Sequence, residues 1–144
     1  MVKKLKPKAI ELKVFAQAFD PEIILNERQL LVAYALAKKA FENKENKSTS
    51  LENETLAKVA ATAKLAEAIK IAGAKDAKDF LLMTDANDAT LDKLLASIQA
   101  KKTEANFSPN KKKLANVFGI TKTLLENYSE EEIILEKMAL SGTD

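Results

Sequence analysis

The segment KLAEAIKIAGAKD, residues Lys64–Asp76, has apolar residues at helical spacing and then reaches a glycine. One face of such a helix would carry Leu65, Ala68, Ile69 and Ala72. Gly73 tolerates the positive φ at which many helices end, so the helix is expected to stop there. The apolar run Phe80–Met83 follows without alternation, which favours a strand covered on both faces, although a buried helix has the same pattern. A helix followed by a buried strand predicts a small α+β domain.

The N-terminal third of the chain predicts one strand and one long helix. Apolar residues alternate over Ile10–Ala16, which is the period-2 pattern of a half-buried strand, and Asp20-Pro21 would end it. Asn26 can cap a helix, and Gln29 three residues later completes a variant of the capping box. This helix should end near Asn43, and its apolar face consists of Leu30, Ala33, Tyr34, Ala37, Ala40 and Phe41.

The rest of the chain is expected to be mainly helical. After the polar loop Asn43–Ser50, a capping box of Thr49 and Glu52 would open a helix that leads into the KLAEAIK helix. Further helices are predicted by the apolar positions Leu91, Leu94, Leu95 and Ile98, by Ser108-Pro109, and by the capping box Ser129–Glu132. We expect one α+β domain over residues 1–144, with a small mixed sheet packed by several helices and an all-helical C-terminal third.

The composition excludes most catalytic mechanisms. The chain contains neither cysteine nor histidine, so it has no disulfide, no thiolate nucleophile and no imidazole base or metal ligand. Its net charge of +2 is too small to bind nucleic acid by bulk charge, so any such contact needs a local patch. The sequence has no long apolar span and no signal-peptide core, so we expect a cytoplasmic protein without membrane contact.

Three aspartates near the middle of the chain suggest a metal loop at first sight. Asp85, Asp88 and Asp92 are close in sequence, but the central glycine of a calcium loop is missing. Carboxylates at a helix start, where they complement the helix dipole, explain them better. A small hydrolase built on these aspartates remains a minor alternative. No nucleophile–base pair and no glycine-rich phosphate loop is present, so we expect no enzyme activity and no cofactor.

Two segments, EAIKIAGAKD at Glu67–Asp76 and ILEKMAL at Ile134–Leu140, resemble a known family. They are similar to the kinase-binding regulatory subunit of the KEOPS tRNA-modification complex, of the archaeal TPRKB type. The resemblance implies a non-catalytic subunit that binds and stimulates the small atypical KEOPS kinase/ATPase. It also implies a role in holding tRNA while a separate subunit installs threonylcarbamoyl on adenosine, with other KEOPS subunits as indirect partners.

The final helix has apolar residues on two sides. One side carries Ile134, Leu135, Met138 and Ala139, and the other carries Ile133 and Leu140. Such a helix either lies deep in its own fold or offers one side to a partner. The residues leave both readings open. The family resemblance implies that this helix belongs to the kinase-docking surface, with Ile134, Leu135 and Met138 as the binding residues.

Lysines gather in two places, and arginine occurs only at Arg28. The first group is Lys58, Lys64, Lys70 and Lys75, and the second is Lys101, Lys102 and Lys111–Lys113 around Phe107. Lysine-rich helix faces are usually solvated surface, but they also contact phosphates. The resemblance implies that Lys58, Lys64 and Lys75 bind the single-stranded 3′ CCA end of tRNA. A stand-alone RNA-binding protein that uses these patches is the alternative.

The same segment departs from the family pattern at three positions. The family runs approximately Arg-x-Ser-Gly-x-Arg-Gln-Ile before the Glu-Ala-Ile helix. Lys58 keeps the first charge, but Ala60, Ala61 and Ala63 stand at the serine, glycine and second arginine. Glycine permits a close approach of RNA to the backbone, and alanine restricts it.

Overall fold

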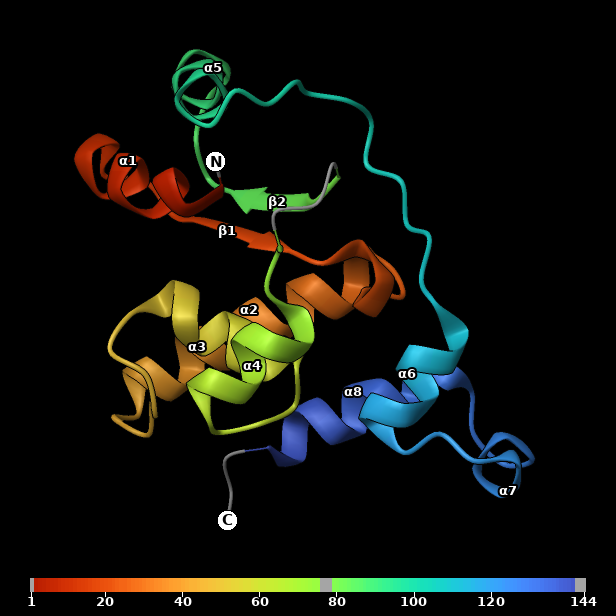
Figure 1. Cartoon of the computed structure of the whole chain (residues 1–144). Helices are drawn as coiled ribbons and strands as arrows, with labels where there is room; N and C mark the ends of the chain where they lie inside the picture. Colours follow the sequence, from red (N-terminus) through yellow and green to blue (C-terminus); the bar gives the residue numbers. More distant parts are fainter. Residues whose placement is uncertain (1, 76–78, 142–144) are drawn as a thin grey trace.

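A computed structural model describes residues 2–75 and 79–141 of the chain (Figure 1). Its elements, in chain order, are the 3-10 helix η1 (Val2–Lys4), α1 (Leu5–Leu12), β1 (Ala16–Phe19), the 3-10 helix η2 (Pro21–Ile23), α2 (Glu27–Glu42), α3 (Leu51–Val59), α4 (Leu65–Ala72), β2 (Leu81–Thr84), α5 (Asp88–Ser97), α6 (Lys111–Phe118), α7 (Lys122–Leu125) and α8 (Glu130–Leu140). The predicted α+β class and the helical C-terminal third are confirmed. Asp76, the last residue of the opening motif, lies outside the described residues.

The two strands form a narrow antiparallel ribbon between two layers of helices. Ala16 pairs with Thr84 and Phe19 with Leu81, and these are the only strands in the described part of the chain. The sheet is therefore smaller than expected. In Figure 1, α1 and α5 lie on one side of the ribbon, and α2, α3 and α4 lie on the other.

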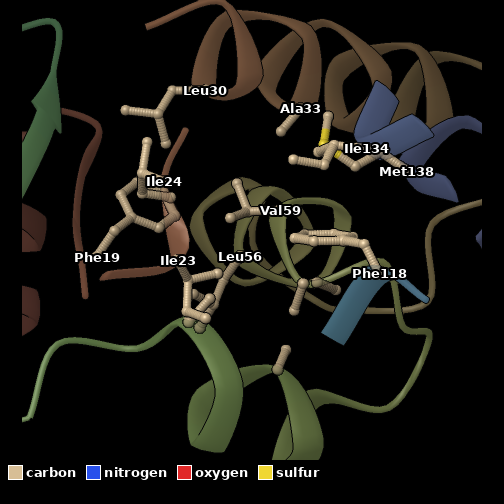
Figure 2. Close-up of a cluster of buried hydrophobic side chains, with 14 of the residues drawn as sticks. Phe19, Ile23, Ile24, Leu30, Ala33, Leu56, Val59, Phe118, Ile134 and Met138 are labelled. Atoms are coloured by element: carbon tan, nitrogen blue, oxygen red, sulfur yellow. The ribbon is translucent and has the colours of Figure 1, made fainter. Parts of the chain in front are cut away.

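Each face of the ribbon belongs to a different hydrophobic cluster. Leu81 and Met83 of β2 contact the main cluster, whereas Phe80 and Leu82 contact the second cluster beside α1 and α5. The prediction that this apolar run is a strand covered on both faces is confirmed. The main cluster joins the ribbon to α2, α3, α4, α6 and α8 (Figure 2). Its largest fully buried side chains include Phe19, Phe118 and Ile24.

The strand expected at Ile10–Ala16 is mostly wrong, because α1 ends only at Leu12 and β1 begins at Ala16. Leu5 and Ala9, one helical turn apart, are the residues that α1 buries, and both pack in the second cluster with α5. Ile10, which the alternation placed on a buried face, is 68% exposed. The contact with α5, more than 70 residues away in sequence, selects the helix.

The helix starts were predicted with mixed success. Asn26 caps α2 by accepting from the N–H of Gln29 at 3.1 Å. The Gln29 side chain does not close the box on Asn26, because it accepts from the N–H of Leu25 and donates to the carbonyl of Ile23. Two predicted caps are wrong by one or two residues, because Ser50 rather than Thr49 caps α3, and Asn110 rather than Ser108 caps α6.

Gly73 does end α4, but not by adopting a positive φ. Its φ is −68° and its ψ is 143°, which any residue can adopt. A Cβ at this position would lie 2.6 Å from the carbonyl oxygen of Ile69. Glycine is required here because the chain passes too close to the preceding turn, on its way to a single bridge with Phe19.

Candidate functional site

Helix α8 is fixed firmly at its start. The N–H of Glu132 donates to Ser129 Oγ at 3.1 Å, and Glu132 Oε1 accepts from the N–H of Ser129 at 3.0 Å, so the predicted capping box is confirmed. The hydrogen bond from the Ser129 backbone holds the pKa of the Glu132 carboxyl below its usual value, because it stabilises the charged form. Three glutamates in the first turn also complement the helix dipole.

The three residues predicted to bind a kinase have different environments. Ile134 and Met138 are 1% and 0% exposed in the main cluster, as Figure 2 shows beside Ala33. Leu135 is half-buried and packs against that cluster from outside. The side chains of Ile134 and Met138 fill the core, so a partner can reach only Leu135 of the three without opening the fold.

Leu135 lies at a junction between two helices. Along α2, Arg28, Val32 and Leu36 are spaced by four residues and so share one side of the helix, as Glu131 and Leu135 do on α8. Arg28 Nε lies 3.4 Å from Glu131 Oε1, an ion pair without hydrogen-bond geometry. These sides of α2 and α8 therefore face each other at the ion pair. Val32, Leu36 and Leu135 are all half-buried. We call these five residues the α2–α8 seam.

Of the three lysines predicted to bind tRNA, Lys64 and Lys75 lie at opposite ends of α4. Lys64 is exposed at its N-terminal end, and its N–H donates to Thr62 Oγ1. Lys75 follows its C-terminal end and lies 3.9 Å from Asp20 Oδ2, with 61% of its side chain exposed. The eight-residue helix α4 keeps the two apart by about 12 Å along its axis.

Lys58 is already engaged within the fold. Its Nζ donates to the carbonyl of Ser141 at 3.0 Å, which ties the end of α3 to the C-terminus of α8. A cation at a helix C-terminus complements the dipole, so this contact stabilises the packing of the two helices. Of the predicted RNA-binding lysines, Lys64 and Lys75 are the more available.

The turn between α3 and α4 explains the glycine in the family pattern. The N–H of Thr62 donates to the carbonyl of Ala57 and the N–H of Ala61 to that of Lys58, which is the Schellman pattern of helix ends. Ala61 occupies the left-handed position of this motif, with φ 54°. Glycine is favoured there because it lacks a Cβ. This chain keeps the turn but puts alanine in it.

Two lysines of the second group, Lys111 and Lys113, are paired with carboxylates. Lys111 Nζ lies 2.5 Å from Glu130 Oε1, and Lys113 donates to Glu22. The hydrogen bond to Glu22 raises the pKa of the Lys113 ammonium. These contacts join α6 to α8 and η2, so they are better explained as links between elements than as a phosphate-binding patch.

Two of the three aspartates considered for a metal site, Asp85 and Asp88, have places in the fold that explain them. Asp85 Oδ1 accepts from the N–H of Phe15 at 2.9 Å and so extends the β1–β2 pairing by one step. Asp88 lies in the first turn of α5. Within residues 2–75 and 79–141, no three acidic side chains form a group able to hold a metal ion. No helix of the described chain is long and apolar enough to cross a membrane.

A comparison with protein families identifies the family of this chain. The family model described as "Kinase binding protein CGI-121" matches residues 2–142, which is nearly the whole chain. The chain belongs to the CGI-121 family of kinase-binding proteins. No curated protein matches the chain. In this CGI-121 protein, α8 buries Ile133, Ile134 and Met138 within the fold, and Leu135 is half-buried beside them.

Sequence reasoning missed most of the seam. Val32 and Leu36 were not among the residues assigned to the apolar face of α2. Only the packing of α2 on α8, about 100 residues later in the chain, brings the two helices together.

Proposed function

We propose that the protein is a non-catalytic regulatory subunit of a KEOPS tRNA-modification complex, which binds and stimulates the small kinase/ATPase subunit through the α2–α8 seam. The supporting observation is that Val32 and Leu36 of α2 and Leu135 of α8 are all half-buried, on two helices that the Arg28–Glu131 ion pair joins. Specific interfaces commonly have this composition, with an apolar centre and a charged rim. Because α8 is anchored by Ile134 and Met138 on its inner side, the seam is a rigid surface that needs little ordering on binding.

A binding titration with the kinase subunit tests the seam. Leu135→Arg places a charge at the apolar centre, so the dissociation constant should rise by more than about tenfold, which is 1.4 kcal/mol. Ile10→Arg is the matched control, because Ile10 is exposed on α1, away from the seam. It should bind as the unmodified protein does. Equal affinity of both variants would refute the seam as the binding surface.

The variant Met138→Arg tests whether α8 is a core helix or an interface helix. Met138 is 0% exposed, so a charge there would be buried without a partner and should unfold the domain. Leu135→Arg, at a half-buried position, should keep the helical circular dichroism signal. If Met138→Arg instead folds normally and loses only kinase binding, α8 is an interface helix rather than a core helix.

For the second part of the role, we propose that the 3′ CCA end of tRNA binds along α4, with Lys64 and Lys75 contacting phosphates and Lys58 adding charge nearby. The support is the exposure of Lys64 at one end of α4 and of the Lys75 side chain at the other. Single-stranded RNA suits such a site, because its backbone charge is read without base pairing.

Salt-dependent tRNA binding tests this site. The double variant Lys64→Glu and Lys75→Glu should weaken binding and reduce the slope of log affinity against log salt by about 1.4, since each single-strand phosphate contact contributes about 0.7. Lys111→Glu with Lys112→Glu changes the total charge equally and should have a smaller effect. Removal of the CCA end should weaken binding by the unmodified protein. If both double variants weaken tRNA binding equally and removal of the CCA end has no effect, the tRNA site is refuted and only the kinase-binding role remains.

Co-purification from native extract distinguishes the broader classes. A regulatory subunit should bring a kinase-like protein, whereas a stand-alone RNA-binding protein should bring nucleic acid only. The structural roles of Asp85 and Asp88 support the absence of catalysis in this proposal. Recovery of nucleic acid without a kinase would favour the stand-alone alternative.

A further inference from the structure

One edge of β1 has few hydrogen-bond partners among the described residues. Phe15 directs both its backbone groups toward β2, because its carbonyl accepts from the N–H of Asp85 and its N–H donates to Asp85 Oδ1. Successive residues of a strand point their backbone groups to opposite edges. Gln17 and Phe19 therefore face β2, and Ala16 and Ala18 face the other edge.

That other edge is only partly satisfied. At its far end, the N–H of Asp20 donates to the carbonyl of Ala72 at 2.9 Å. The carbonyl of Ala18 accepts from the Gln17 side chain at 2.9 Å. In the described residues, no partner is found for the N–H and carbonyl of Ala16 or for the N–H of Ala18. Both alanines are buried, at 4% and 2% exposure, so unpaired groups there cost stability.

These unpaired groups lie along a groove of about 450 Å³. One wall comes from the N-terminal turn and α1, with Lys3 and Lys6, and the other comes from α3 and α4, with Leu56 and Ile69. Lys75 stands at its end. Ile69 is 52% exposed, although it is a large apolar residue. Among the described residues that line the groove, three are lysines and none is acidic.

We propose that this groove binds a short extended peptide with acidic side chains, which adds to the open edge of β1 as a further strand. An antiparallel peptide residue opposite Ala16 would exchange two hydrogen bonds with it, and a residue two places away would accept from the N–H of Ala18. The alternation of an added strand fits the two walls, with acidic side chains toward Lys3 and Lys6 and apolar ones toward Leu56 and Ile69.

The proposal goes beyond kinase binding and does not depend on it, because no seam residue lines the groove. Single-stranded RNA could use the same lysines, but it has no regular alternation of N–H and carbonyl groups to match the strand edge. A protein segment is therefore the occupant that the edge favours. The bridge between Phe19 and Gly73 closes the far end, so only three or four peptide residues can pair.

A labelled peptide tests the groove directly. The probe is acetylated Asp-Val-Asp-Val-Asp-Val amide, followed by fluorescence anisotropy and by ¹⁵N NMR of the protein. Binding should shift the amide signals of Ala16 and Ala18 and slow their hydrogen exchange at least tenfold. The matched probe with lysine at each aspartate should bind at least tenfold more weakly. Failure of the acidic probe to bind, or equal binding of both probes, would overturn the proposal.

Two protein variants and one modified probe identify the contacts. Ala18→Pro removes an N–H that the β1–β2 pairing does not use, and it should weaken binding at least tenfold. Lys3→Glu with Lys6→Glu should do the same, whereas Lys111→Glu with Lys112→Glu should not. If Ala18→Pro does not fold, N-methylation of the probe at its pairing positions gives the same test. Binding that survives N-methylation, or shifts of these amides only with a single-stranded CCA trinucleotide, would refute the added strand.

Discussion

Replacement of Ala61 by glycine should stabilise the protein, although glycine usually destabilises helical proteins. Ala61 has φ 54° at the end of α3, where its Cβ crowds the following carbonyl. Relief of this strain is worth about 1–2 kcal/mol. The greater freedom of glycine in the unfolded chain costs about 0.4–1 kcal/mol. With a small loss from the half-buried methyl, the net gain should be about 0.5 kcal/mol.

The neighbouring alanine provides a matched control. Ala60 has φ −82° and is 3% exposed, so glycine there relieves no strain and removes a buried methyl. Ala60→Gly should therefore destabilise the protein by about 1.5 kcal/mol, from about 0.8 for the methyl and the rest from backbone entropy. The two variants should differ by about 2 kcal/mol, which is well above the error of a two-state comparison of midpoints.

Urea unfolding followed by circular dichroism measures this difference. The midpoint of Ala61→Gly should rise, that of Ala60→Gly should fall, and the m-values should be unchanged. Thermal unfolding should show the same order. If Ala61→Gly destabilises the protein as much as Ala60→Gly does, Ala61 is not in the left-handed position, and the explanation of the family glycine as a helix end fails.

Three further changes test other parts of the fold. Gly73→Ala forces a Cβ against the Ile69 carbonyl and should cost about 2 kcal/mol in unfolding free energy; an unchanged urea midpoint would contradict the close approach. The N–H groups of Lys47 and Ser48 both donate to Glu54 Oε1 at 2.8 Å. Glu54→Ala leaves them without this partner, so it should lower the free energy of unfolding by about 3 kcal/mol in the same assay. Because the folded-state pKa of Glu132 is lowered, its contribution is present above the ordinary carboxyl pKa and is lost as pH falls through the lower folded value. Glu132→Gln should reduce the loss of stability over that acid range, and an unchanged profile would refute the assignment.

The helix ends show what the local sequence can and cannot predict. Ser129 and Asn26 were identified as caps because each is followed at once by a strongly helical pattern, and both are confirmed. Ser50 and Asn110 were missed because other cap-forming residues stand beside them. Local chemistry does not choose between neighbouring caps, because the packing of the helix face decides where the first turn begins.

The Schellman turns were also hidden in the sequence. Three further helices end in this motif without glycine, since Lys13, Lys44 and Gln99 have φ of 58°, 59° and 56°. Glycine is the usual signal for such an end, and a chain with three glycines does not provide it at these positions. Helix α1 was not predicted for the same reason, because it ends at Lys13, a residue that does not signal a helix end in the sequence.

The candidate site was predicted in part. Ile134, Leu135 and Met138 were chosen together from the family resemblance, but Ile134 and Met138 lie in the core. A single helix pattern does not tell which apolar side is covered within the chain. Lys58 was chosen because it keeps the first charge of the family pattern, and its contact with Ser141 depends on the meeting of two helix ends 83 residues apart. Contacts of this range follow from the tertiary structure alone.

The central claim is that the kinase binds at the α2–α8 seam, and methyl NMR tests it most directly. The protein is labelled at the methyl groups of isoleucine, leucine and valine, and it is titrated with the kinase subunit. The account predicts the largest changes at Val32, Leu36 and Leu135, with Ile10 and Leu125 unchanged as exposed reporters elsewhere. Changes centred on Ile10 or Leu125, with the seam methyls unaffected, would contradict it.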